Sequence, residues 1–223
     1  MALFRDITEQ DITENYVYVW TPSIVLTPST RKYWAGTEWS FMTFNPQMIL
    51  AQLQNARKKV QDALASKKNI LVVAEKEMVA AEITALAKEK NFHYMLHKTP
   101  WGFLTNFDTL IKRIAVMNEK KQFIASENFS KTTKKEQEQM KRSLRKIQKV
   151  YEGVGSLQKK PDLVVVLDGS QMMSLVKELA LTGIDNVVMA SSDFSQRREK
   201  NNLVTMNVNS YKSIMFVFNY LFS

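Results

Sequence analysis

Hydrophobic positions in the first half of the chain alternate between two spacings. Over residues 47–66 they recur every three to four positions, as on one face of a helix. The next apolar run, at 69–74, is continuous, which is typical of a strand buried on both faces of a sheet. Helical spacing returns over 77–90, and 92–96 predicts a further short strand. This half therefore predicts helices and buried strands in alternation.

The same alternation resumes after Pro161. Residues 163–167 (LVVVL) predict a second buried strand, and a helix is expected over 170–181 with Gly183 at its C-terminal cap. Three further elements are expected: a strand at 186–190, a strand at 203–208 and a closing helix at 210–222. Alternating apolar strands and helices predict an α/β fold, with a Rossmann-like (flavodoxin-like) parallel sheet flanked by helices.

A different pattern separates these halves. Residues 112–160 carry two narrow apolar stripes of helical spacing on either side of a break near 128–132, and nearly all other positions are charged or polar. This predicts an inserted hairpin of two antiparallel helices packed as a coiled coil. Thr133 and Glu136 have the spacing of a capping box at the start of the second helix.

The pattern thus predicts three parts. Residues 1–46, punctuated by prolines, are expected to form an irregular N-terminal arm with one or two strands, at 16–20 and 23–26. Residues 47–111 and 161–223 are expected to form the α/β domain, and residues 112–160 the inserted helical hairpin. The N-terminus carries Asp and Glu early, so neither a secretory signal nor an Arg-rich transit peptide is expected.

Positive charge is concentrated in the hairpin segment. The chain has 31 Lys and Arg against 22 Asp and Glu, and residues 112–160 hold 14 of the former and five of the latter. The remaining chain is neutral, so this segment accounts for the whole surplus of nine. Such a segment suits a polyanion, although many charged helix faces are simply solvated. A membrane-surface role is less favoured because the apolar stripes are narrow and lack Trp, and no apolar run is long enough to span a membrane.

Several kinds of catalytic site are disfavoured by the composition. The chain has no Cys and only two histidines, His93 and His97, which lie in a strand-like context and are expected to be structural or to face a polyanionic partner. Neither a Gly-rich dinucleotide fingerprint nor a P-loop is present, so no cofactor, metal or small-molecule substrate is expected. Asp168 and Asp193 follow predicted strands, where α/β folds bind ligands, but helix caps are the favoured interpretation.

A series of stretches resembles, in order, the bacterial-type small-subunit ribosomal protein two family. They are YWAGTE at 33–38, KKNILVVAEK at 67–76, the signature-loop counterpart WGFLTNF at 101–107, TTKKE at 132–136, KPDLVVVLD at 160–168 and NVNS at 207–210. Two departures stand out: residues 1–32 lack the family's His-Phe-Gly-His and Trp-Asn-Pro-Lys-Met stretch, and the signature loop keeps one glycine of a pair.

The resemblance implies a Rossmann-like domain with an inserted coiled-coil hairpin, seated between head and body of the small ribosomal subunit. It implies a non-enzymatic protein whose partners are small-subunit ribosomal RNA and neighbouring small-subunit ribosomal proteins. The divergence, together with enrichment in Lys, Asn, Met and Phe, favours a mitochondrial ribosome over a plastid or bacterial cytoplasmic one.

On this hypothesis, lysine and arginine side chains, together with one asparagine, bind rRNA phosphates and backbone, and base readout is not required. The candidates are Lys98, Asn106 and Arg113 near the signature loop, Lys131, Lys134 and Lys135 at the start of the second hairpin helix, and Lys141, Arg142, Arg145, Lys146 and Lys149 along it. Two alternatives remain open at this point. One is a nucleotide-binding α/β enzyme using Asp168 and Asp193, and the other is an adaptor whose hairpin pairs with another coiled coil.

Overall fold

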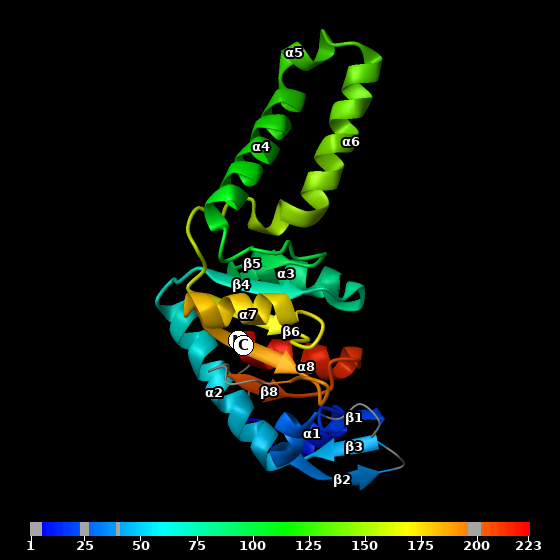
Figure 1. Ribbon diagram of the computed structural model, residues 1–223, viewed down its shortest axis with the longest axis vertical. Coiled ribbons are helices and arrows are strands. Elements are labelled where there is room, and N and C mark those ends of the chain that lie inside the picture. Colours follow the sequence, from blue (N-terminus) through cyan, green and yellow to red (C-terminus); the bar gives the residue numbers. More distant parts are fainter. Residues whose placement is uncertain (1–5, 23–26, 39–40, 196–201) are drawn as a thin grey trace.

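The fold is built around a five-stranded parallel sheet (Figure 1), in a computed structural model that describes residues 6–22, 27–38, 41–195 and 202–223. The strand order is β5-β4-β6-β7-β8. The strands are β4 (Ile70–Ala74), β5 (His93–Met95), β6 (Leu163–Leu167), β7 (Asp185–Ala190) and β8 (Leu203–Thr205). The strand after β4 is added on one side of it, and the later strands β6, β7 and β8 are added on the other side. The strand order therefore reverses between β4 and β6, as in flavodoxin-like sheets. The predicted α/β fold with a parallel sheet is therefore confirmed.

The two neighbouring strands β4 and β6 account for the continuous apolar runs in the sequence. They pair in parallel from Ile70 with Leu163 to Ala74 with Leu167, and every residue of both strands is buried. Successive residues point to opposite faces of a sheet, so a strand covered on both faces has no polar position.

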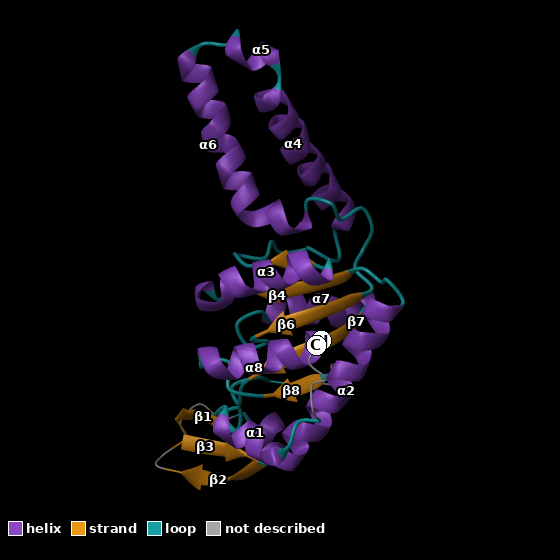
Figure 2. Ribbon diagram, turned by 180° about the vertical axis from the view of Figure 1, so that it is seen from behind, coloured by secondary structure: helices purple, strands orange, loops and turns teal. Residues whose placement is uncertain are grey.

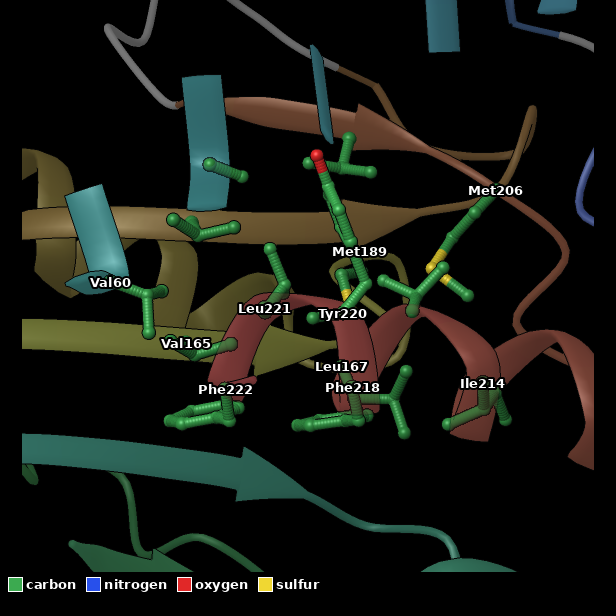
Figure 3. Packing of buried hydrophobic residues seen from close by; sticks show 14 of the residues in the cluster. Val60, Val165, Leu167, Met189, Met206, Ile214, Phe218, Tyr220, Leu221 and Phe222 are labelled. Carbon is green, nitrogen blue, oxygen red and sulfur yellow. The ribbon is translucent and has the colours of Figure 1, made fainter. Parts of the chain in front are cut away.

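Helices cover both faces of this sheet. On one face lie α2 (Pro46–Ala65), α3 (Ala80–Lys90) and α8 (Tyr211–Phe222), and on the other lies α7 (Met173–Thr182). Figure 3 shows Ile214, Phe218 and Phe222 in a row along α8 beside Val165 and Leu167. The four-residue spacing places these three apolar side chains on one face of α8, and burial of each contributes about 1.5–3 kcal/mol.

Local signals determine several helix ends. Asn45 caps α2 by accepting a hydrogen bond from the Gln47 N–H, and Pro46 occupies the first turn. Gly183 ends α7 with a φ of 68°, so the predicted C-terminal cap is confirmed. The expected helix at 77–90 is divided into a 3-10 turn, η3 (Glu77–Val79), and α3. The expected strand at 203–208 ends earlier, at Thr205.

The N-terminal region differs from the irregular arm expected. It forms a three-stranded antiparallel sheet of order β1-β3-β2, from β1 (Val19–Pro22), β2 (Trp34–Glu38) and β3 (Phe41–Phe44). A helix α1 (Glu9–Glu14) and a 3-10 turn η2 (Pro28–Tyr33) complete it, and the strand expected at 23–26 lies outside the described residues. The prediction of at most two strands was wrong because these strands are short and their pairing depends on contacts distant in sequence.

Two helices project from the opposite end of the molecule (Figures 1 and 2). They are α4 (Phe107–Ala125) and α6 (Lys134–Tyr151), joined by a single turn α5 (Glu127–Ser130), and α6 is followed by a 3-10 turn η4 (Glu152–Val154). They run antiparallel as a hairpin, and α4 begins at Phe107 rather than at 112. Coiled-coil packing of the two helices stays a prediction. Among the described residues, no helix combines the length and apolarity that a membrane crossing requires.

Candidate nucleic-acid interface

The base of the hairpin is anchored in the hydrophobic core. Ile114 and Met117 of α4, with Leu144 and Tyr151 of α6, are buried in the cluster that covers the α7 face of the sheet. These residues belong to the apolar stripes that predicted two helices. Because packed interiors are dense and resist compression, this anchoring fixes the direction in which the hairpin leaves the domain.

Contacts between the two helices continue outward from this base. The Lys120 ammonium donates to the Ser143 hydroxyl at 2.7 Å, which joins α4 to α6. Near the tip, the rings of Phe123 and Phe129 meet edge to face with centroids 6.3 Å apart, and Lys141 Nζ lies 5.5 Å from the Phe129 ring centroid. Such aromatic and cation–π contacts stabilise a tip that has little core of its own.

The start of α6 carries the predicted capping box. The Thr133 hydroxyl accepts from the Glu136 N–H, and the Glu136 carboxylate accepts from the Thr133 N–H at 3.0 Å, so this prediction is confirmed. These hydrogen bonds with the backbone and side chain of Thr133 lower the pKa of Glu136. The carboxylate is thereby bound to its own helix terminus.

All eleven candidate RNA-binding side chains are exposed. Lys135, Arg142 and Lys146 fall on one side of α6 at helical spacing and line an open groove of about 710 Å³. The structure therefore brings three of the predicted cations to one surface. We call this surface, formed by Lys135, Arg142 and Lys146, the α6 groove.

One acidic residue lies within the α6 groove. Glu138 accepts from Arg142 Nε at 3.0 Å, one helical turn away, with both side chains largely exposed. The hydrogen bond from Arg142, followed by the charges of Arg142, Arg145 and Lys141, lowers the pKa of Glu138. The pair is solvated, and an exposed ion pair of this kind contributes little to stability.

The other candidates lie at the two ends of the hairpin, along α6 and in the loop before the hairpin. Lys141, Arg145 and Lys149 are on α6, and Lys98 is in the loop after β5. Lys131 and Lys134 lie at its tip, beside the α6 N-terminus. Asn106 immediately precedes α4 and accepts a hydrogen bond from the Thr109 hydroxyl at 2.8 Å, and Arg113 lies about two turns into that helix. The cations therefore follow the hairpin from base to tip instead of forming one compact cluster.

A buried carboxylate beside the hairpin base escaped the sequence analysis. Glu178 of α7 is 9% exposed and accepts from the backbone N–H groups of Gly102, Leu104 and Thr105, at 2.7, 2.8 and 3.3 Å. It thereby holds the loop that carries the WGFLTNF stretch. The one available signal was an acidic residue among the apolar positions of the predicted helix at 170–181.

The strand-end carboxylates form a closed polar network. Lys76 Nζ lies 2.9 Å from Asp168 Oδ2 and donates to Asn209 Oδ1 at 3.0 Å. The Ser170 hydroxyl lies within hydrogen-bond distance of both Asp168, at 2.8 Å, and Asp193, at 2.9 Å. An ion pair therefore sits at the carboxyl end of β4 and β6, where doubly wound sheets bind their ligands.

The helix caps predicted for both aspartates were wrong. The cap of α7 is Met172, and Asp168 has a φ of 67° and accepts from the Gln171 N–H, which stabilises the turn before the helix. Asp193 lies in a turn, and the two described residues that follow it are not helical. An aspartate at the end of a strand resembles a helix cap in sequence. Here the roles of both aspartates depend on Lys76 and Ser170, and the local sequence pattern does not show these contacts.

The two histidines lie in different environments. His93 lies in β5 and is half-buried, whereas His97 is exposed in the loop that follows. Burial lowers the pKa of His93, and a hydrogen bond with the Gly153 backbone opposes this shift. In the part of the chain that the structure describes, no three His, Asp or Glu side chains gather as metal ligands.

Comparison with known proteins yields one family. Residues 18–223 match the family described as Ribosomal protein S2. Similar proteins include small ribosomal subunit protein uS2 of Wolinella succinogenes, 28% identical over 80% of this chain and 66% of that protein. The uS2 protein of Amoebophilus asiaticus is 28% identical over 84% of this chain and 60% of its own length. Small ribosomal subunit protein uS2c of Trieres chinensis is 32% identical over 59% of this chain and 58% of its own. The chain thus spans less than two thirds of the relatives it matches.

Proposed function

The chain belongs to the ribosomal protein S2 family, and from this premise we propose that it is a structural constituent of a small ribosomal subunit. Its proposed partners are small-subunit rRNA and neighbouring small-subunit ribosomal proteins, as the names of its relatives suggest. The observation that carries the RNA-binding part is the segregation of charge. The entire positive surplus lies in residues 112–160, and the candidate cations there are exposed.

The proposed mode of binding is electrostatic. Lysines and arginines along the hairpin neutralise successive phosphates and release condensed counterions, which gives affinity without base readout. The anchored base supports this role because cations on a rigidly mounted helix keep their relative positions when the RNA arrives. The α6 groove is the proposed centre of the phosphate-binding surface.

We propose no catalytic role for the chain. The family is a structural class, and the comparisons offer no support for the nucleotide-binding enzyme alternative. In addition, Lys76 satisfies the charge of Asp168 at the sheet edge where such an enzyme would bind its ligand. A carboxylate engaged in this way is a poor general base or metal ligand.

We propose a mitochondrial ribosome as the location. The support is compositional: the chain is rich in Lys, Asn, Met and Phe and departs from its relatives over most of its length. Density-gradient purification of organelles, followed by immunodetection, tests this part independently of RNA binding. Recovery of the chain with plastid or cytosolic ribosomes would reject the mitochondrial assignment and retain the ribosomal one.

Sedimentation of a native lysate tests the function itself. In a sucrose gradient at moderate salt and magnesium, detected with an antibody against this chain, we expect co-migration with the small subunit. Digestion with RNase before loading should shift the chain to slow fractions. A slow peak without RNase treatment would contradict the ribosomal role, and co-migration with a protein complex that survives RNase would indicate the coiled-coil adaptor instead.

A further inference from the structure

The most exposed aromatic side chain described in the structure lies at the foot of the hairpin. Trp101 is 84% exposed, whereas Phe103 and Leu104, two and three residues later, are fully buried. An indole ring usually buries a large apolar area, and its free exposure in water is unfavourable. The intrachain packing therefore gives no reason for a tryptophan at this position.

The loop that carries Trp101 is held firmly in place. Gly102 has a φ of 78°, which glycine tolerates, and its carbonyl accepts from the Asn106 N–H at 2.8 Å. The buried Glu178 carboxylate accepts three further N–H groups from the same loop. Hydrogen bonds to a charged acceptor are strong, so this loop is pre-organised. The inward-turned Phe103 and Leu104 leave the indole of Trp101 outside.

The charges near the loop favour a polyanionic partner. Over residues 97–113 the exposed cations are Lys98, Lys112 and Arg113, and the one exposed acidic residue is Asp108. The negative charge of Glu178 is buried against backbone N–H groups and does not reach the surface. An exposed indole close in sequence to exposed cations suits unpaired nucleotides, because bases stack on the ring while the cations attract their phosphates.

We propose that Trp101 stacks on an unpaired base of the small-subunit rRNA, and that Glu178 is the positioning residue that holds the indole ready. This inference rests on the proposed function and adds to it a contact of a different kind. The hairpin cations bind phosphates, whereas Trp101 binds the face of a base. Because every base has such a face, the contact fixes position without selecting sequence.

Binding measurements with substituted proteins test the proposal. The probe is rRNA extracted from purified small subunits, and the full-length chain is titrated with it at several salt concentrations. For Trp101→Ala we expect an affinity roughly five-fold to 100-fold weaker than wild type, with an unchanged salt dependence, because stacking releases no counterions. Trp101→Phe should bind within a few-fold of wild type, and Trp101→Leu, which is apolar but not aromatic, should bind as weakly as Trp101→Ala.

An exposed leucine on α7 supplies the matched control. Leu181 is 79% exposed on α7, one helical turn beyond Glu178, and its side chain cannot stack as an aromatic ring does. Leu181→Ala should leave rRNA affinity unchanged. If Leu181→Ala and Trp101→Ala weakened binding equally while Trp101→Leu did not, the site would be a general apolar contact and the proposal would be wrong.

Two further readouts separate stacking from a structural effect. Part of the tryptophan fluorescence should be quenched by rRNA in wild type and not in Trp101→Phe, and ultraviolet cross-linking should attach a nucleotide to Trp101. Glu178→Gln should speed amide hydrogen exchange at Gly102 and Leu104 and weaken rRNA binding without altering its salt dependence. If Glu178→Gln weakened rRNA binding without faster amide exchange at Gly102 and Leu104, Glu178 would not be a positioning residue.

The outcomes distinguish this inference from the function beneath it. Salt-dependent rRNA binding that is identical in wild type and Trp101→Ala would reject stacking and leave the phosphate-binding role intact. In that case, particles that contain the Trp101→Ala variant should be compared with wild-type particles after RNase treatment. A neighbouring protein that remains bound to the wild-type chain and is lost from the variant would identify a protein contact instead. Absence of salt-dependent binding in wild type would reject both proposals. Thermal unfolding of each variant shows that the comparison concerns folded proteins.

Discussion

Gly153, in the turn that follows the hairpin, packs closely against the sheet. A Cβ atom at this position would collide with the carbonyl oxygen and ring of Tyr94 in β5, so Gly153→Ala must displace η4 or the strand. We expect a loss of about 1–3 kcal/mol in the free energy of unfolding, measured by urea denaturation. Gly155→Ala is the matched control, because its Cβ would lie 3.2 Å from the end of Met117 and 3.3 Å from the Glu152 carbonyl oxygen, which small shifts can accommodate. Equal losses in the two variants would show that the close approach to Tyr94 is unimportant.

His93, on the same strand, makes stability depend on pH. Burial lowers its pKa below the ordinary value of about 6.5, so over the acid range the unfolded chain binds the proton more tightly than the folded protein does. The folded protein favours the neutral imidazole, so this contribution to the free energy of unfolding is fully present above the ordinary pKa of histidine. It is lost as the pH falls and the imidazole must be protonated. We expect thermal unfolding midpoints to fall more steeply between about pH 7 and pH 5 in wild type than in His93→Gln. Parallel pH profiles would contradict this account.

At the scale of elements, the α6 groove gives the most direct test of phosphate binding. Replacing Lys135, Arg142 and Lys146 together by Gln should make the slope of log affinity against log salt shallower by about two to three. The effect should be uniform across rRNA sequences because phosphates carry no base identity.

A matched triple variant outside the hairpin controls for net charge. Lys58, Lys68 and Lys88 are exposed on or beside α2 and α3, and replacing them by Gln removes the same charge. This control should keep the wild-type slope. If both triple variants changed the slope equally, net charge rather than the α6 groove would govern binding.

The elements also show what a sequence pattern can and cannot predict. Residues 163–167 were predicted as a strand and form β6, because burial on two faces produces a continuous apolar run. The Thr133–Glu136 capping box was predicted and is present, because its hydrogen bonds join residues only three positions apart. The sheet β1-β3-β2 and the hydrogen bonds between Glu178 and the loop at 102–105 were not predicted, because both depend on partners far along the chain. The candidate cations were predicted from charge alone, and their grouping into the α6 groove required the fold.

At the scale of the whole molecule, the α/β core and the charged hairpin tip are separable. The buried hairpin residues end at Met117 on α4 and begin again at Leu144 on α6. The intervening residues make few core contacts yet include Lys131, Lys134 and Lys135. Stability therefore resides in the sheet and the hairpin base, whereas much of the proposed affinity for RNA resides in the tip.

Shortening the hairpin tests this division. Replacing residues 122–141 by a short Gly-Asn linker retains Met117, Leu144 and the Lys120–Ser143 hydrogen bond, so the thermal unfolding midpoint should stay within a few degrees of wild type. The same variant loses four of the candidate cations, and its affinity for rRNA should fall with a salt slope shallower by about three to four. A variant with the full-length tip and those four cations changed to Gln should match it. If shortening weakened binding while neutralisation did not, the shape of the hairpin rather than its charge would make the contact.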